Sequence, residues 1–386
     1  MHWKTKLIQS DVRPPEGFKS LVTPIQRAST VVFSKQSDVS SNWRHAQEGY
    51  TYGLYGTPTS RELAARIGEL EGAYRTIVLP GGQAAISLIY LAFCSAGDHA
   101  LVPYSAYGPN KELAENLLGR LGIEVEPYDP LIGAGIASLI RDNTKLIWCE
   151  SPGSVTMEIQ DVRGISEAAH DRGVLVALDN TYAAGVLFDA FSHGVDLSMQ
   201  ALTKYVGGHS DLMLATISVA NDAVWERIGT VHRLVGMAVS PDECALALRG
   251  LQTLAVRMDR LQASTLTVAS WLREHPAVET VLHPAFPDCP GHEYWLRDFS
   301  GSSSVFSVKF RDAVDPRAVE NFVDTLKLFS IGFSWGGVHS LVILYPRLVR
   351  PGKDYGGRLV RFNIGLEEPA DLIGDLQDAM QKAGIS

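Results

Sequence analysis

The sequence predicts an α/β fold, and the pattern of its central part leads to that prediction. Between about residues 56 and 240, short apolar runs rich in β-branched residues alternate with longer segments of helical periodicity. This alternation is typical of a mostly parallel sheet with helices on both faces. The chain of 386 residues is also long enough for a large core and for more than one domain.

Three parts follow from the composition along the chain. Residues 1–55 carry Pro14, Pro15, Pro24 and many serines and predict an irregular arm, which needs a surface to dock on. Residues 56–240 predict the α/β domain. Residues 241–386 begin with long helical patterns and continue with strand-like runs, which predicts a smaller α+β domain.

The individual elements come from short runs of sequence. Helical patterns lie at 59–72, 82–97, 111–122, 243–275 and 371–384, and strand patterns lie at 75–80, 99–104, 144–150, 174–179, 303–310, 340–346 and 358–364. The strand patterns within residues 56–240 are continuously apolar, as expected for strands buried on both faces of a sheet.

Composition excludes several classes of protein. The net charge is −9 and basic residues form no patch with aromatic residues, which argues against nucleic acid. Apolar runs stay below about 18 residues, so no membrane span is expected, and the polar start predicts no secretory signal. The four widely spaced cysteines predict reduced thiols in a cytoplasmic enzyme rather than a zinc or redox motif: Cys94, Cys149, Cys244 and Cys289.

Lys204 and Asp179 carry the strongest chemical signal. Each follows an apolar run and should lie at the carboxyl end of a strand, where open α/β sheets bind ligands. A lysine can form an imine with the aldehyde of pyridoxal 5′-phosphate (PLP), and an aspartate can keep the pyridine nitrogen protonated. Because most lysines are surface groups, the prediction depends on the residues around Lys204.

A phosphate site is predicted at the Gly81-Gly82 turn, where a strand leads into a helix near Gln83. Free N–H groups at a helix start attract anions, and glycine permits close approach. Taken alone, the pair fits an ordinary strand-to-helix turn better. Thr203 could add a hydroxyl to the phosphate, or could be a strand residue chosen for β-propensity.

Other candidates surround the same site. Tyr107 could stack on the ring or serve packing, and Arg361 could grip a substrate carboxylate or form a surface ion pair. Ser334 and Trp335 could form a wall beside Arg361 or belong to a plain loop. His209 and Asp211 are too few to hold a metal ion, so no metal is expected.

Together these segments resemble the Cys/Met-metabolism family of PLP enzymes, of fold type I, over nearly the whole chain. The matching segments are DPLIGA, ESPGSVTMEIQDV, LDNTYAAGVLFDA, MQALTKYVGGHSD, GSSSVFSVKF, FSWGGVHSL and RFNIGLE. ESPGS is the most discriminating, since the cystathionine β-lyases carry Gly-Ser there and other branches usually carry Thr-Asn-Pro. The resemblance therefore implies an aspartate-aminotransferase-like fold and a carbon–sulfur β-lyase that releases homocysteine, pyruvate and ammonia from L-cystathionine, in transsulfuration toward methionine.

The resemblance also implies roles for particular residues. Lys204 is the Schiff-base lysine, Asp179 faces the ring nitrogen and Tyr107 stacks on the ring. Gly82, Gln83 and Thr203 hold the phosphate, and Arg361 binds the substrate carboxylate beside Ser334 and Trp335. Tyr52 of the arm should reach the phosphate of a neighbouring subunit, in a homo-oligomer expected to be a tetramer built from dimers.

One position departs from the family pattern, and several alternatives stay open. The family commonly has arginine two residues after that tyrosine, where this chain has Leu54; Tyr55 or Arg61 could compensate. γ-Lyase, γ-synthase, homoserine-ester sulfhydrylase and broader cysteine-conjugate β-lyase activities fit the same scaffold. A dehydrogenase is disfavoured because G-x-G-x-x-G is absent after the strand, and an inactive PLP fold is disfavoured because Lys204, Asp179, Tyr107 and Arg361 are all retained.

Overall fold

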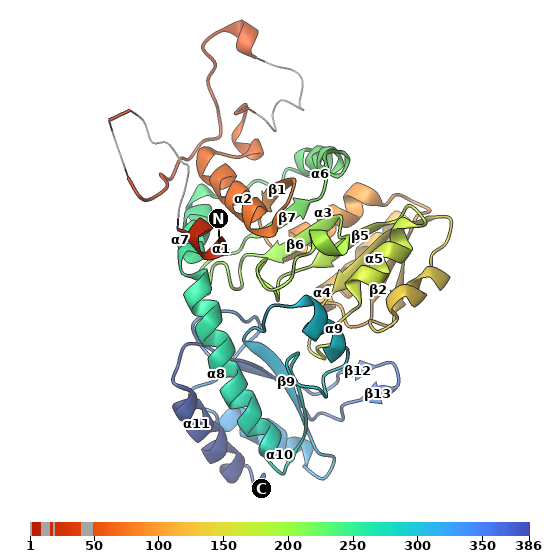
Figure 1. The fold of residues 1–386 in the computed structure, drawn as a ribbon, viewed down its shortest axis with the longest axis vertical. Coiled ribbons are helices and arrows are strands. Elements are labelled where there is room, and N and C mark those ends of the chain that lie inside the picture. The colour runs from red at the N-terminus through yellow and green to blue at the C-terminus, as the bar shows by residue number, and fades with distance from the viewer. Residues whose placement is uncertain (1, 9–15, 18–19, 40–48) are drawn as a thin grey trace.

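The computed structural model describes residues 2–8, 16–17, 20–39 and 49–386. Figure 1 shows a larger upper part and a smaller lower part, with the long helix α8 (Leu254–Glu274) running down one side. The described stretches of the arm hold a short helix α1 (Trp3–Lys6) and the 3₁₀ turns η1 (Gln36–Asp38) and η3 (Gly53–Tyr55).

The upper part is built on a seven-stranded sheet of order β1-β7-β6-β5-β4-β2-β3. Only β7 runs antiparallel to its neighbours, β1 and β6; all other pairs are parallel. The predicted mostly parallel α/β fold is therefore confirmed. The strands are β1 (Arg75–Leu79), β2 (His99–Pro103), β3 (Glu124–Tyr128), β4 (Thr144–Glu150), β5 (Leu175–Asp179), β6 (Leu197–Ala201) and β7 (Ala215–Val219).

Helices cover both faces of this sheet because its central strands are apolar on both sides. In β4, Leu146 and Trp148 pack on one face with α3 and α6, whereas Ile147 and Cys149 pack on the other with α5. The helices of this part are α2 (Pro58–Glu71), α3 (Gly82–Phe93), α4 (Gly108–Leu113), α5 (Val162–His170) and α6 (Asp222–Val235).

The lower part is a five-stranded sheet of order β10-β11-β14-β9-β8, with α8, α10 and α11 packed on its apolar face. Its strands are β8 (Val278–Leu282), β9 (Val305–Phe310), β10 (Ser330–Ile331), β11 (Leu341–Tyr345) and β14 (Leu359–Asn363). The hairpin β12 (Val349–Arg350) and β13 (Lys353–Asp354) and the helices α9 (His292–Asp298), α10 (Pro316–Thr325) and α11 (Pro369–Lys382) complete it. Helix α7 (Pro241–Gln252) packs against α2 in the upper part instead (Figure 1).

Two predicted helices differ in detail from the structure. The helix expected at 111–122 begins earlier, at Gly108, and continues as a π-helical turn η4 (Ala114–Leu118) and a 3₁₀ turn η5 (Gly119–Leu121). The helix expected at 243–275 is interrupted at Thr253, which ends α7 and begins α8.

None of the described helices combines the length and apolarity that a bilayer span requires.

The topology gathers several side chains at one edge of the large sheet. Tyr107 follows β2, Glu150 ends β4, Asp179 ends β5 and Lys204 follows β6. Since these four strands are parallel, their carboxyl ends lie at the same edge, as in other open α/β sheets that bind ligands there.

Candidate active site

Lys204 lies in the turn after β6 and reaches the smaller part of the molecule. Its Nζ donates a hydrogen bond to Ser334 Oγ at 2.8 Å and lies 5.6 Å from the centre of the Trp335 ring. Burial, and secondarily the positive charge of Arg361, lower the pKa of Lys204 to about 8, against an opposing effect of Asp179. The amine can therefore lose its proton near neutral pH.

The turn that carries Lys204 is held from behind by a buried arginine. The Arg257 guanidinium donates to the carbonyl oxygens of Tyr205 at 2.6 Å and Gly250 at 2.8 Å. Burial lowers the pKa of Arg257 to about 10. The α7–α8 junction thus fixes the backbone immediately after Lys204.

Asp179 ends β5 with its carboxyl group held by the next turn. Its Oδ1 accepts hydrogen bonds from the Thr181 N–H at 3.0 Å and from the Thr181 hydroxyl. Burial raises the pKa of Asp179, while Thr181 and the charge of Lys204 oppose that rise. A cation placed beside this carboxyl group would favour its ionised form.

Tyr107 stands at the start of α4 with 46% of its surface exposed. Its N–H donates to Glu150 Oε2 at 2.7 Å. Burial is the main cause that raises the pKa of the Tyr107 phenol; Asp179 and Glu150 add to it and Arg361 opposes it. The bond to Glu150, the register partner of Asp179, places Tyr107 at the same edge of the sheet as Asp179.

Arg361 comes from β14 and is 9% exposed. It donates to the Ser334 carbonyl at 3.3 Å, and its guanidinium carbon lies 5.7 Å from the centre of the Tyr345 ring. It makes no ion pair with a carboxylate of the described residues. Ser334 thus contacts Lys204 through its hydroxyl and Arg361 through its carbonyl, which brings both cations to one site.

The start of α3 lies at the same edge of the sheet. Gly81, the residue before the helix, has φ +155°, and no side chain caps the helix there. The first N–H groups, including those of Gly82 and Gln83, are therefore open to an anion. The Gln83 side chain donates to the Pro109 carbonyl at 3.1 Å, and the Thr203 hydroxyl donates to the Leu214 carbonyl at 3.2 Å, so both side chains have partners within the chain.

These groups suit PLP and an amino acid. A lysine of lowered pKa feels the charge of a half-buried aspartate, a helix start lacks a side-chain cap, and a buried arginine lacks a carboxylate among the described residues. The lysine suits the aldehyde of PLP, the aspartate its pyridinium, the helix start its phosphate, and the arginine the carboxylate of a substrate.

The contact described for Tyr52 lies within the arm and not in the cluster around Lys204. Tyr52 is 50% exposed and pairs with Thr30 of the arm. Arg61 donates to the carbonyl oxygens of Tyr55 and Gly49 and stacks on the Tyr50 ring, so it is engaged within its own chain. Leu54 presents no polar group in place of the arginine of the family pattern.

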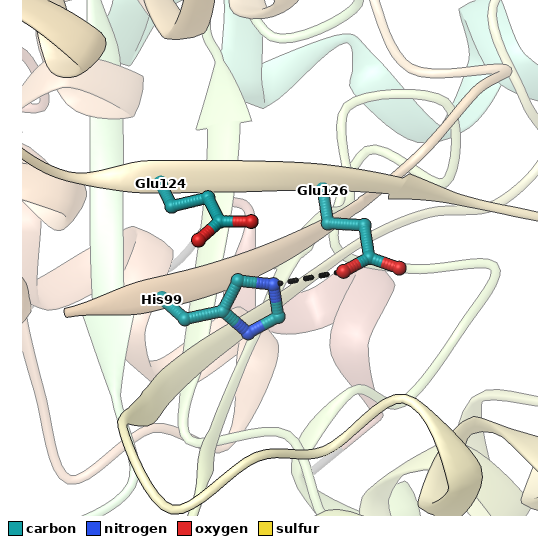
Figure 2. Close-up of side chains that lie close together, drawn as sticks. All are labelled: His99, Glu124 and Glu126. Carbon is teal, nitrogen blue, oxygen red and sulfur yellow. Dashed lines mark ion pairs between the residues drawn. The ribbon is translucent and has the colours of Figure 1, made fainter.

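The histidines form no metal site near Lys204 in the described chain. The His209 ring bonds the carbonyl of Gly207 at 2.8 Å. The one candidate metal group among the described residues is His99, Glu124 and Glu126 on β2 and β3, where His99 Nε2 lies 3.3 Å from a Glu126 oxygen (Figure 2). Arg141 already pairs with both glutamates, and His99 begins β2 at the end away from Tyr107. We interpret the group as an ion-pair network.

Comparison with known proteins identifies the family. The model of the Cys/Met metabolism PLP-dependent enzymes matches residues 4–381. The chain belongs to this family. Among the family's named proteins, it is 42% identical over 361 residues to the cystathionine beta-lyase MetC of Escherichia coli, covering 91% of each chain. It is 40% identical over 371 residues to the cystathionine beta-lyase of Haemophilus influenzae, covering 94% of this chain and 93% of the relative.

Solved structures agree with the family assignment. The structure of cystathionine gamma-lyase from Lactobacillus plantarum, complexed with L-serine, superposes with a TM-score of 0.90 at 27% identity, and both chains are covered completely. This confirms the predicted fold type, and family membership makes the chain a PLP-dependent enzyme.

Sequence reasoning missed three residues that the structure places at the site. Glu150 ends a buried strand, which is the same signal that selected Asp179, so it could have been found. Tyr345 ends β11 and faces Arg361 only because β11 pairs with β14, and Arg257 reaches the Lys204 turn from another helix. Those two contacts join distant segments and leave no local pattern.

Proposed function

We propose that this enzyme cleaves the Cβ–S bond of L-cystathionine and releases homocysteine, pyruvate and ammonia. The observation that carries the proposal is the meeting of Lys204, Asp179 and Arg361 at one edge of the sheet, in a chain about 40% identical to named cystathionine β-lyases. The ESPGS segment at 150–154 supports β- over γ-cleavage within the family.

The residues of the site receive the roles expected from their chemistry. Arg361, buried and without a carboxylate partner among the described residues, binds the α-carboxylate of the substrate beside Ser334 and Trp335. Asp179 faces the pyridine nitrogen. Gly82, Gln83 and Thr203 hold the phosphate, to which Tyr52 of a second subunit adds a contact. Thr203 would have to release the Leu214 carbonyl to do so.

When bound, PLP supplies an electron sink for the charge left at the substrate Cα. Lys204, with a pKa lowered to about 8, removes the Cα proton as an amine. Lys204 or the Tyr107 phenol then donates a proton to the sulfur as the Cβ–S bond breaks. The thiol leaves as homocysteine, and the remaining three-carbon unit takes up one water and releases ammonia as it becomes pyruvate.

The test is the keto acid formed from L-cystathionine. Pyruvate is expected, whereas 2-oxobutyrate would show γ-cleavage and contradict the proposal. A panel of other cysteine conjugates separates a strict cystathionine β-lyase from a broader enzyme.

Lys204→Ala tests the role of the lysine. We expect it to abolish both turnover and the adduct that borohydride traps on the wild-type chain, as read by intact-mass spectrometry. Lys145→Ala, which removes an exposed lysine of β4, serves as the control and should retain both. An adduct on another side chain, or turnover by Lys204→Ala, would overturn the assignment.

We also propose a cytoplasmic homotetramer of dimers with shared sites, divided into an arm (1–55), a PLP-binding domain (56–240) and a C-terminal domain (241–386). The arm exposes large apolar side chains, among them Leu21, Val22 and Val32, which supports docking on another subunit. All four cysteines are buried free thiols, which supports a reducing compartment.

A further inference from the structure

Tyr107 is positioned by its backbone rather than by its ring. It precedes the first residue of α4, so the helix offers its N–H no acceptor. Nearly half of its surface is exposed, and its phenol makes no hydrogen bond to the described residues. The place of the ring therefore depends on what holds the peptide of Tyr107.

Two hydrogen bonds tie residues 105–107 to residues 150–154, at the end of β4 and just after it. The Tyr107 N–H donates to Glu150 Oε2 at 2.7 Å, and the Ser154 N–H donates to the Ser105 carbonyl at 2.7 Å. The two segments touch so closely that a Cβ atom on Gly153 would lie 2.6 Å from Ser105 Oγ. Glu150 is the one side chain in this arrangement that reaches Tyr107 itself.

Burial and a neighbouring carboxyl group disfavour a charge on Glu150. The residue is 8% exposed and forms no ion pair with a described basic side chain. Its register partner on the adjacent strand is Asp179, a second carboxyl group. Burial first, and then Asp179, raise the pKa of Glu150 well above its usual range, against the opposing effects of the Tyr107 N–H and of the positive charge of Arg350. A neutral carboxyl group still has a carbonyl oxygen that accepts the Tyr107 N–H.

We infer that Glu150 is a positioning residue: its side-chain oxygen fixes the Tyr107 peptide so that the phenol stands over the cofactor and beside the leaving sulfur. The inference rests on the proposed function of Tyr107. This role needs an accepting oxygen at the end of a side chain as long as that of glutamate. It needs no negative charge, and a charge on Glu150 would compete with Asp179 for the positive charge of the cofactor.

Two conservative variants make opposite predictions. Glu150→Gln keeps the reach and the accepting oxygen but removes the acid, and we expect kcat, KM and the PLP dissociation constant to stay within about twofold. Glu150→Asp keeps the acid but shortens the side chain by one methylene, so the bond to Tyr107 is lost. We expect kcat to fall roughly 10- to 100-fold, as for other displacements of reacting groups by about 1 Å.

Visible circular dichroism of the bound cofactor provides a readout besides activity, because it reports how the ring is seated. Glu150→Asp should weaken this band and Glu150→Gln should preserve it. Glu158→Ala is the control. It removes a buried carboxyl group from the segment that follows β4 and leaves the Glu150 oxygen that accepts from Tyr107. It should leave the band and kcat near the wild-type values.

Three other outcomes overturn the inference. A damaged Glu150→Gln would show that the acid itself is needed, and an undamaged Glu150→Asp would show that the bond is not. Equal damage in Glu158→Ala would indicate general loosening of the loop. A wild-type enzyme that binds no PLP or forms no pyruvate would instead refute the proposed function.

Discussion

Ser334 has a backbone conformation that serine rarely adopts, and it contacts both cationic side chains of the site. Its φ is +78°, while its hydroxyl accepts from Lys204 and its carbonyl accepts from Arg361. Such a conformation costs on the order of 1–3 kcal/mol and persists only where the surroundings impose it. The neighbouring Gly336 N–H, bound to Asn363 at 2.8 Å, supplies part of that constraint. Strain at this residue is thus associated with the geometry of the site.

Leu54 gives a prediction about cofactor affinity. Arg61, a possible substitute for the arginine of the family pattern, is engaged by the carbonyl oxygens of Gly49 and Tyr55. We expect Leu54→Arg to add a charged hydrogen bond to the phosphate, worth roughly 1.5–3 kcal/mol, and to lower the PLP dissociation constant about 10- to 100-fold. Absorbance titration of the cofactor-free protein measures it. Leu54→Met is the uncharged control, and an unchanged or weaker affinity in Leu54→Arg would contradict the prediction.

Helix α7 packs directly against the turn that carries Lys204. A Cβ atom on Gly250 would lie 2.1 Å from the Val206 carbonyl oxygen, which belongs to that turn. We expect Gly250→Ala to displace the turn, to lower the free energy of unfolding by about 1–3 kcal/mol and to weaken PLP binding. Thermal unfolding and PLP titration measure the two effects.

Gly374 provides the matched control for Gly250. It lies in α11, where a Cβ atom would meet nothing within 4 Å. Gly374→Ala should therefore be neutral or stabilising by up to about 1 kcal/mol. A Gly250→Ala protein as stable as Gly374→Ala, with normal PLP affinity, would show that α7 does not constrain the lysine.

His283, just after β8, predicts a loss of stability in acid. It is completely buried, its Nδ1 accepts from the Ala285 N–H at 3.1 Å, and burial lowers its pKa from 6.5 to about 4. The unfolded chain therefore binds this proton more readily than the folded chain. The contribution of His283 to the free energy of unfolding should be fully present above pH 6.5. It should be lost as the pH falls from there through about 4, a loss of roughly 3 kcal/mol.

A single substitution isolates this effect. His283→Asn keeps an acceptor for the Ala285 N–H but does not titrate. Urea unfolding of both proteins between pH 7 and 4, with PLP held constant, should show a smaller decline for His283→Asn. Parallel declines would assign the acid sensitivity to other groups.

The sequence predicted the elements that carry strong periodicity, and it missed those that depend on pairing. Strand β5 and helix α2 appear where their patterns lie, because burial on both faces or on one face leaves a clear signature. Strand β3 has only one buried residue, Tyr128, and was not predicted. The same holds for the residues of the site. Lys204 and Asp179 were predicted from their positions after apolar strands, whereas the contact of Tyr345 with Arg361 depends on the pairing of β11 with β14.

At the scale of the molecule, the site joins the two sheets. Lys204 and Asp179 come from the larger sheet, and Arg361 and Ser334 come from the smaller part. The described contacts between Lys204, Ser334 and Arg361 lie within one chain. Tyr52 lies on the arm, half exposed, and makes none of these contacts. In the shared site that we propose, Tyr52 would therefore come from a second subunit.

Subunit mixing tests this arrangement. We expect co-expression of Lys204→Ala with Tyr52→Ala chains to form hybrid dimers in which one of the two sites has both native residues. With random pairing, about a quarter of the sites should be intact, so pyruvate formation at limiting PLP should exceed that of either variant alone. In the control, Lys204→Ala is mixed with Arg361→Met. Because Lys204 and Arg361 meet through Ser334 of the same chain, each hybrid site then keeps one defect and no activity should return. Hybrids confirmed by two affinity tags, yet without recovery in the Tyr52 mixture, would show that Tyr52 does not act across subunits.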